Sequence, residues 1–326
     1  MRWSLWHLFS NRVAFLLLLV PIVALILGQM SPWFLTLDNL LGMTQFGAVL
    51  ALLGMGQTLV IVGGGAGIDL SIGAILSLTG VILGLLVRAG VNVWLAALMS
   101  ILFAGLLGMG NGLVVTRLRL PPLIATLGTM YAYGAIALVI TRGFPISGFP
   151  PEFAFLGQEY IFDLIPAQVL LVVVPAWIVL HYIVRYTRFG REVYLVGTNE
   201  RAAALSGINV QAVRTWLYTL AGVLAGLGAV INSSWLFSAR PDVGNNMELQ
   251  AITVAVLGGA SMLGGEGSLT GTMLAVLILT MVSSGLQLAN VPVIWQLAVQ
   301  GGILLGAVAF NQALALRAAR ERGVRL

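Results

Sequence analysis

Apolar runs of membrane-crossing length recur from one end of the chain to the other, separated by short polar or glycine- and proline-rich breaks. A helix needs roughly 20 mostly apolar residues to cross the hydrocarbon layer of a bilayer. The runs predict helices over residues 13–30, 45–62, 70–87, 93–115, 121–141, 166–184, 214–232, 249–263, 269–289 and 293–312. We therefore expect an all-α, polytopic membrane protein in which residues 1–326 form a single transmembrane domain, with about ten transmembrane helices in one bundle.

The arginines are distributed unevenly between the two sides of this predicted bundle. The side that holds both chain ends carries thirteen: Arg2, Arg12, Arg117, Arg119, Arg185, Arg188, Arg191, Arg201, Arg214, Arg317, Arg320, Arg322 and Arg325. The opposite side carries three: Arg88, Arg142 and Arg240. Because short loops rich in basic residues stay in the cytoplasm, this distribution predicts that both termini are cytoplasmic.

The composition excludes several kinds of chemistry. The chain has no cysteine, and its two histidines, His7 and His181, have no partner at ligand spacing, so no metal site is predicted. All sixteen basic residues are arginine, so the phosphate-binding lysine of a P-loop is missing. We expect that the chain binds no cofactor and does not itself hydrolyse ATP. Its arginines belong to one membrane face and indicate contact with a lipid bilayer, not with nucleic acid.

One polar segment, Thr198 to Val210 (TNERAAALSGINV), lies within a predicted cytoplasmic loop of residues 185–214. Asn199 is a good N-cap, and Glu200 in the first turn suits the helix dipole. Gly207 offers a left-handed C-cap. Strong helix formers lie between them: Ala202, Ala203, Ala204 and Leu205. We predict about two turns of helix with a small alanine face, which is either a connector packed on the bundle or a helix presented to a cytoplasmic partner.

Several blocks of the sequence resemble the permeases of bacterial ABC-type sugar importers, the ribose and autoinducer importer family. The resemblance rests on FGREVYLVGTNERAAALSGINV (189–210), QTLVIV and GIDLSIGAILSLTG (57–80), LPPLIATLGTMYAYGAIALVITRG (120–143) and SARPDVGNNMELQAITVAVLGGASMLGGEGSLTGT (238–272). These blocks occur in the family's order and span nearly the whole chain. One departure is Glu266, which stands where many members carry a basic residue.

The resemblance implies an importer in the bacterial inner membrane that works with other subunits. The expected partners are cytoplasmic ATPase subunits that use ATP and magnesium, a periplasmic substrate-binding protein, and a second permease subunit that is identical or homologous. It also implies that the short polar helix docks on the ATPase. The residues assigned to this coupling are Asn199, Glu200, Arg201, Ala202, Ala203, Ala204, Leu205, Ser206 and Gly207.

Two acidic residues lie next to glycine-rich breaks in the apolar pattern. Asp69 precedes the predicted helix of 70–87, and Glu266 precedes GSLTG before the helix of 269–289. Each is predicted either to cap the helix that follows or to act as a gate where helices meet. The two breaks also resemble each other, since TLVIVGGGAGIDLSIG (58–73) and TVAVLGGASMLGGEGSLTG (253–271) both place a double glycine, an acid and a serine after an apolar run.

Uncharged polar residues greatly outnumber charged ones inside the predicted helices, which favours an uncharged substrate. Amide and hydroxyl groups suit a neutral polyhydroxy ligand, although they also serve as hydrogen bonds between helices. The candidates for a substrate path are Gln57, Asn111, Thr126, Gln250, Thr253, Gln296 and Gln300.

From the resemblance and from these polar residues we expect the chain to be part of an importer of a monosaccharide or a related small polyol. A nucleoside importer permease has a similar layout and remains an alternative. An ion-coupled secondary transporter would need ionisable relays deep in the bundle, and a membrane-embedded enzyme would need clustered catalytic groups. Beyond Asp69 the predicted helices hold essentially no ionisable relay, and the two histidines are unpaired, so the secondary transporter is a less favoured alternative and the enzyme a poor one.

Overall fold

The computed structural model describes residues 12–321, except for the side chains of Val293, Phe310, Asn311 and residues 313–321. Each of the ten predicted ranges contains a helix. These helices are α2 (Arg12–Met30), α3 (Leu37–Val62), α4 (Ile72–Arg88), α5 (Val93–Arg117), α6 (Pro122–Thr141), α8 (Val174–Tyr186), α11 (Val210–Leu236), α12 (Met247–Leu257), α13 (Leu269–Leu288) and α14 (Val293–Glu321). A π-helical turn, η2 (Val169–Val173), runs directly into α8.

The helices confirm a polytopic, all-α membrane protein. Seven helical segments in the described part of the chain are long and apolar enough to cross a membrane. Two further apolar helices, α4 (Ile72–Arg88) and α12 (Met247–Leu257), are shorter, and the apolar part of α14 within the described side chains is Ile294–Ala309. The number of crossings therefore stays a prediction.

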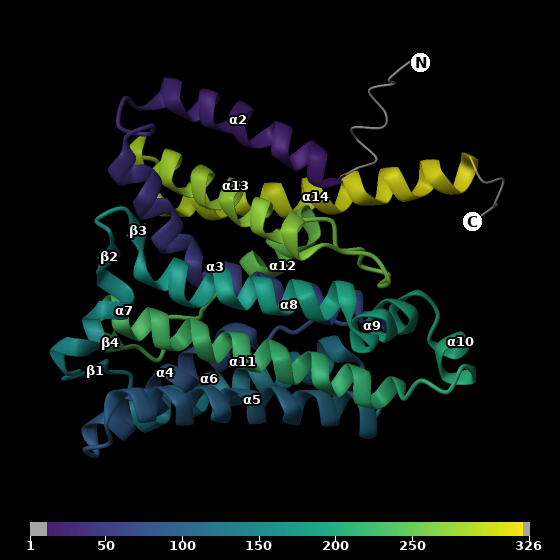
Figure 1. Cartoon of the computed structure of the whole chain (residues 1–326), viewed down its shortest axis with the longest axis horizontal. Coiled ribbons are helices and arrows are strands. Elements are labelled where there is room, and N and C mark those ends of the chain that lie inside the picture. Colours follow the sequence, from purple (N-terminus) through teal and green to yellow (C-terminus); the bar gives the residue numbers. More distant parts are fainter. Residues whose placement is uncertain (1–11, 322–326) are drawn as a thin grey trace.

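The bundle is built around α3 and α11. In the most apolar part of α3, 89% of the residues are buried, and in that of α11, 67%; in the corresponding part of α2 only 11% are buried. Figure 1 shows α2 on the outside of the bundle and α11 running alongside α5. These two helices approach very closely, since a Cβ on Gly108 would lie 2.2 Å from the Tyr218 carbonyl oxygen. Small residues permit this approach, which is how helices associate in lipid.

The long segment between α6 and η2 forms a structured cap over one end of the bundle. Strand β1 (Ile146–Ser147) pairs antiparallel with β4 (Ser238–Ala239), and β2 (Tyr160–Ile161) pairs with β3 (Ile165–Pro166). A short 3-10 helix, η1 (Pro151–Phe153), and α7 (Ala154–Gln158) lie between β1 and β2 in the chain. The Phe153 side chain is fully buried, and the Gln45 amide donates to the Gly157 carbonyl at 2.7 Å. The β1–β4 pair places the ends of α6 and α11 at the same end of the bundle.

The opposite end carries two further helices, α9 (Arg188–Thr198) and α10 (Glu200–Leu205). In Figure 1, α2 begins and α14 ends at this same end. This arrangement fits an even number of crossings. The terminal arginines Arg2, Arg322 and Arg325, as well as His7, lie outside the described residues.

Cysteine labelling tests the predicted orientation in this cysteine-free chain. We expect a membrane-impermeant thiol reagent outside sealed cells to label Ser147→Cys and Asp242→Cys, both exposed at the cap end. It should spare Ser206→Cys, which is exposed at the α10 end. Ser147 is a better position than Gly148, because the φ of +99° at Gly148 strains any side chain. Labelling of Ser206→Cys in intact cells would show that the orientation is the opposite of the predicted one.

Candidate functional site

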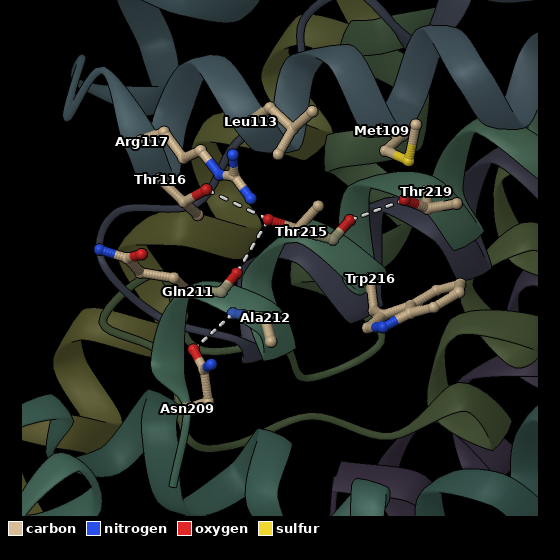
Figure 2. Close-up of a pocket in the computed structure, with 10 residues that line it drawn as sticks. All are labelled: Met109, Leu113, Thr116, Arg117, Asn209, Gln211, Ala212, Thr215, Trp216 and Thr219. Atoms are coloured by element: carbon tan, nitrogen blue, oxygen red, sulfur yellow. Dashed lines mark hydrogen bonds between the residues drawn. The ribbon is translucent and has the colours of Figure 1, made fainter.

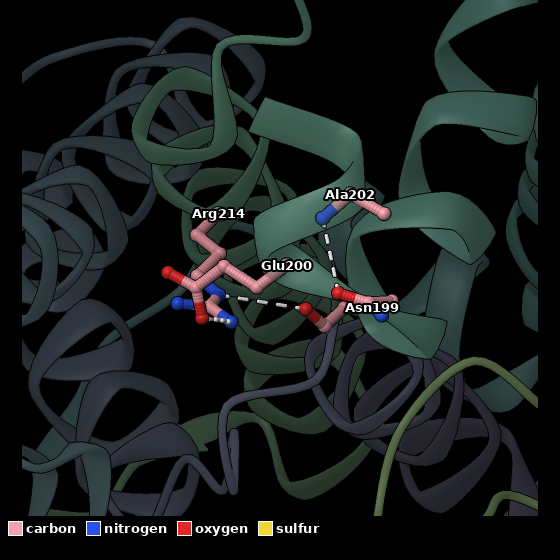
Figure 3. Close-up of polar contacts among 5 residues, drawn as sticks. Asn199, Glu200, Ala202 and Arg214 are labelled. Carbon is pink, nitrogen blue, oxygen red and sulfur yellow. Dashed lines mark hydrogen bonds and ion pairs between the residues drawn. The ribbon is translucent and has the colours of Figure 1, made fainter. Parts of the chain in front are cut away.

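The predicted polar helix is present as α10, with the expected caps. The Asn199 side chain accepts a hydrogen bond from the Ala202 N–H at 3.0 Å (Figure 3). At the other end Gly207 adopts a φ of +83°, and the Ile208 N–H donates to the Ala203 carbonyl at 3.1 Å. The Gly207 N–H donates to the Ala204 carbonyl, which completes a Schellman motif. Local sequence therefore determines both ends of this helix.

The alanine face of α10 is divided between the bundle and the solvent. Ala203 is only 4% exposed and packs into the main hydrophobic core. Ala202 and Ala204 are exposed, and Leu205 is 91% exposed. Our prediction that Ala203 and Ala204 both face a partner is therefore wrong for Ala203, because the helix uses this residue to attach itself to its own chain.

The helix α9, which precedes α10, was not predicted from the sequence. Its N-cap is Thr187, whose hydroxyl accepts from the Gly190 N–H at 3.3 Å. Val193 and Val196 are buried one turn apart. The cap and the valine spacing could have predicted this helix from the sequence. The charged residues of the segment drew attention away from them. The α9 helix holds α10 against the end of the bundle.

Arg214 joins α10 to the first glycine-rich break. Its Nη2 lies 2.8 Å from a carboxylate oxygen of Glu200 (Figure 3). Its Nε donates a long hydrogen bond of 3.5 Å to the Gly63 carbonyl, and its guanidinium lies directly over Gly65. The Arg214 side chain is 16% exposed, whereas that of Glu200 is 53% exposed. The ion pair is thus shielded on one side and bridges α10, α11 and the loop after α3.

The two similar glycine-rich breaks meet in space, and α9 packs on both. A Cβ on Gly197 would lie 2.0 Å from the Val62 carbonyl oxygen and 2.4 Å from the Gly265 amide nitrogen. A Cβ on Gly264 would lie 2.5 Å from the Cα of Gly64. The Gly265 N–H also donates to the Val62 carbonyl at 2.9 Å. We call these residues, Gly64, Gly197, Gly264 and Gly265, the glycine junction.

Tyr194 fastens α9 to the second break. Its hydroxyl donates to the Gly267 carbonyl at 2.9 Å. Burial raises the pKa of this hydroxyl, against a smaller lowering effect of Arg185. The hydroxyl therefore keeps its proton at neutral pH and remains a donor.

Glu266 does not cap the helix that follows it. The N-cap of α13 is Ser268, whose hydroxyl accepts from the Gly271 N–H at 3.2 Å. The Glu266 side chain is 74% exposed, and its carboxylate lies 3.9 Å from Arg12. The prediction of a cap at Glu266 is thus wrong. An exposed ion pair of this length contributes little to stability.

Asp69 organises a buried polar cluster just after the first break. Its Oδ1 accepts from the Ser71 N–H at 2.8 Å and from the Ser71 hydroxyl at 2.6 Å. The Asn111 amide donates to the Ser71 hydroxyl at 2.6 Å, and the Tyr133 hydroxyl donates to Asn111 at 3.2 Å. The Gln57 amide, oriented to satisfy both of its groups, bonds the main-chain N–H and carbonyl of Asp69. This cluster fastens the turn before α4 to α3, α5 and α6.

Three of the seven predicted path residues belong to this cluster. Gln57, Asn111 and Thr126 are all 0% exposed, and the Thr126 hydroxyl donates to the Ile68 carbonyl at 3.1 Å. Asp69 binds the turn before α4, whose N-cap is Ser71, so it supports the helix start without being its N-cap. Its Oδ2 is buried without a hydrogen-bond partner among the described residues. The cluster is closed to solvent in this conformation.

The other three predicted glutamines, Gln250, Gln296 and Gln300, lie on α12 and α14. The Gln250 amide donates to the Gln300 side chain at 3.3 Å, and the Gln300 amide donates to Ser283 at 3.4 Å. Gln296 lies one turn before Gln300 on α14 and donates to the Val291 carbonyl at 2.9 Å. All three glutamines are partly exposed. Thr253, by contrast, is 3% exposed and bonds its own helix.

The start of α12 packs next to α4. The Gly244 N–H donates to the Ser77 hydroxyl at 2.8 Å, and a Cβ on Gly73 would lie 3.0 Å from Glu248 Oε2. Glu248, which precedes the predicted helix of 249–263, thus lies in the first turn of α12. The signal in the sequence for this arrangement is that the predicted helix at 249–263 is short. Broken helices of this kind form substrate sites in transporters.

Comparison with known proteins identifies relatives over most of the chain. Residues 39–308 match the family model described as branched-chain amino acid transport system / permease component. The chain is 38% identical to the ribose import permease protein of Bacillus subtilis (strain 168), over 89% of this chain and 90% of the relative. It is 36% identical to the D-allose transport system permease protein of Escherichia coli (strain K12), over 94% and 93%.

A third relative is the autoinducer 2 import system permease protein of Yersinia pseudotuberculosis (serotype O:1b, strain IP 31758). The identity is 32% over 97% of this chain and 88% of the relative. No solved structure matches the chain. These relatives confirm the family resemblance that the sequence blocks indicated.

The glycine junction makes a direct prediction about stability. We expect Gly197→Ala to lower the free energy of unfolding by about 3 kcal/mol, because the added methyl meets backbone atoms that cannot make way. The matched control is Gly128→Ala on α6, where an added Cβ meets nothing within 4 Å. That control should be neutral or slightly stabilising, since alanine favours a helix more than glycine. Thermal unfolding of the purified chains in detergent measures both, and equal midpoints for the two variants would refute the junction.

Proposed function

The chain belongs to the branched-chain amino acid transport system / permease component family, and from that premise we propose that it is the membrane-spanning permease of an ATP-driven sugar importer. The observation that carries the proposal is the similarity, over nearly the full length of both chains, to permeases for ribose, D-allose and autoinducer 2. Its substrate is a monosaccharide or related small polyol. We place it in the inner membrane of a bacterium, with α10 in the cytoplasm.

Energy for import comes from partner subunits in this proposal. The chain contains no lysine and hence no P-loop lysine to hold nucleotide phosphates. Two ATPase subunits that use ATP and magnesium are assigned to the α10 end, where arginines predominate. A substrate-binding protein is assigned to the capped end, and a second permease subunit completes the membrane part.

The coupling segment is proposed to act as a lever on the break after α3. Ala204 and Leu205, two of the exposed residues of α10, are assigned to contact with the ATPase. Movement of α10 is transmitted through the Glu200–Arg214 ion pair, which reaches the Gly63 carbonyl. It is also transmitted through α9 and the glycine junction. Both routes end at the loop that holds Asp69, so that the Asp69 cluster opens or closes with the ATPase cycle.

The substrate path is proposed to follow the glutamines of α12 and α14. Gln250, Gln296 and Gln300 form a line of amides on two neighbouring helices and are partly exposed, so they can exchange a protein partner for a sugar hydroxyl. Amide groups provide both donors and acceptors for such a ligand. Gln57, Asn111 and Thr126 of the Asp69 cluster are fully buried and hydrogen-bonded within the bundle, which suits them to hold the helices together.

Reconstitution with purified partners tests the proposed function. We expect vesicles containing the chain, its ATPase subunits and its binding protein to accumulate a labelled monosaccharide when ATP is supplied. The chain alone should neither hydrolyse ATP nor accumulate the sugar under a proton or sodium gradient. Gradient-driven accumulation by the lone chain would instead identify a secondary transporter.

The same assay examines α10. Ala204→Glu should prevent close approach of the ATPase and bury an unpaired charge, at a cost on the order of 2 kcal/mol if the contact is central to the interface. Thermal unfolding and membrane insertion should not change, because Ala204 is exposed. Arg201→Gln serves as the control on the same helix and should have a milder effect. Full transport by the Ala204→Glu variant would show that α10 is only a connector and does not contact the ATPase.

A second set of substitutions distinguishes path residues from packing residues. Gln300→Ala should lower transport about tenfold, as expected for losing one hydrogen bond to the substrate, with unchanged thermal unfolding. Gln57→Ala should do the reverse and lower the free energy of unfolding by about 1–3 kcal/mol, because it leaves buried backbone groups of Asp69 unpaired. Transport and unfolding temperature are measured on the same preparations. If Gln300→Ala transports normally, the path lies elsewhere.

A further inference from the structure

A groove of about 290 Å³ lies between the α10-side ends of α5 and α11. It is separate from the glutamines, the Asp69 cluster and the glycine junction. Figure 2 shows the groove with the two helices on either side of it. The residues that line it are Met109, Leu113, Thr116, Arg117, Asn209, Gln211, Ala212, Thr215, Trp216 and Thr219.

The groove is polar at one end and largely apolar at the other. Arg117 ends α5 and Gln211 lies at the start of α11, so both belong to the membrane boundary on the α10 side. Met109 and Trp216 lie one to two turns further into the two spans. They are 38% and 59% exposed on the outer surface of the bundle. A tryptophan at this depth is typical of the membrane interface.

Arg117 is a cation without a partner in the described part of the chain. It makes no hydrogen bond or ion pair there, and no acidic residue lines the groove. Its side chain points into the groove toward Thr215 (Figure 2). The threonine hydroxyls are already engaged, since Thr116 and Thr215 bond each other at 3.1 Å and Thr219 donates to the Thr215 carbonyl. The donors at the polar end that have no partner among the described residues include the Arg117 guanidinium and the Gln211 amide.

We propose that this groove binds an anionic phospholipid of the leaflet on the α10 side. The phosphate of the headgroup pairs with Arg117 and accepts from Gln211, and one acyl chain lies against Met109, Leu113 and Trp216. An anion suits the unpaired guanidinium, because a charge-assisted hydrogen bond to a phosphate is stronger than a neutral one. A lipid is favoured over a soluble phosphate because the polar end continues into an apolar surface that already faces the hydrocarbon layer. The proposal is independent of which substrate the permease carries.

Native mass spectrometry of the full-length chain, released from detergent with added lipid, tests the proposal. We expect phosphatidylglycerol to bind more tightly than phosphatidylcholine of the same chain length. Arg117→Gln should weaken phosphatidylglycerol binding about fivefold, the factor expected for one basic residue at an anionic membrane surface. The matched control is Arg119→Gln, which removes an exposed arginine two residues away that does not line the groove. That variant should bind phosphatidylglycerol as the unchanged chain does.

Each alternative gives a different result. Equal binding of the two lipids, or equal effects of Arg117→Gln and Arg119→Gln, would overturn the proposal. Binding of glycerol phosphate as tight as that of phosphatidylglycerol would show a soluble-anion site instead. If Arg117→Gln changes the proportion of dimer and leaves lipid binding unchanged, the groove is a contact between permease copies. Unfolding temperatures of both variants in lipid-free detergent should match that of the unchanged chain, which keeps a loss of binding distinct from misfolding.

Discussion

At the α10 end of the bundle three chain segments touch through their backbones, because Gly64, Gly197 and Gly265 have no side chains to hold them apart. In a bilayer the helices gain little from hydrophobic association with one another, so close packing and hydrogen bonds must hold them. A break inside the bundle must also find partners for its free backbone groups. The Gly265 N–H and the Val62 carbonyl satisfy each other across the two breaks.

This contact explains how a small surface helix can affect the interior. The α10 helix is short and would not be stable alone, so its position depends on Ala203 in the core and on α9 behind it. The α9 helix in turn rests on the glycine junction. Backbone contact leaves no flexible side chains to absorb a displacement, and close-packed interiors transmit strain. In the coupling that we propose, a push on α10 would therefore be passed to the loops after α3 and before α13.

Polar residues inside the bundle divide into two groups by their burial. Gln57 and Asn111 are fully buried and bonded to the segment around Asp69. Gln250 and Gln300 pair weakly and remain partly exposed. The first arrangement stabilises one packing of the helices, whereas the second is the one that we propose a ligand replaces. In this proposal the same chemical groups serve structure in one place and transport in another.

The sequence by itself determined those features that depend on neighbouring residues. Run length located all ten helical ranges, and the caps of α10 at Asn199 and Gly207 followed from residue type, since both are satisfied within a few residues. Ordered sequence blocks were enough to indicate the family. None of these conclusions requires knowing which helices are in contact.

Only the tertiary structure decided which residues of each helix or break contact the rest of the chain. The burial of Ala203 and the pairing of Gln250 with Gln300 depend on contacts between residues far apart in the chain. The two glycine-rich breaks resembled each other in sequence, but their contact with Gly197 depends on how α3, α9 and the loop before α13 are folded together. A local pattern specifies where a helix begins and ends, whereas its neighbours decide which of its faces is covered.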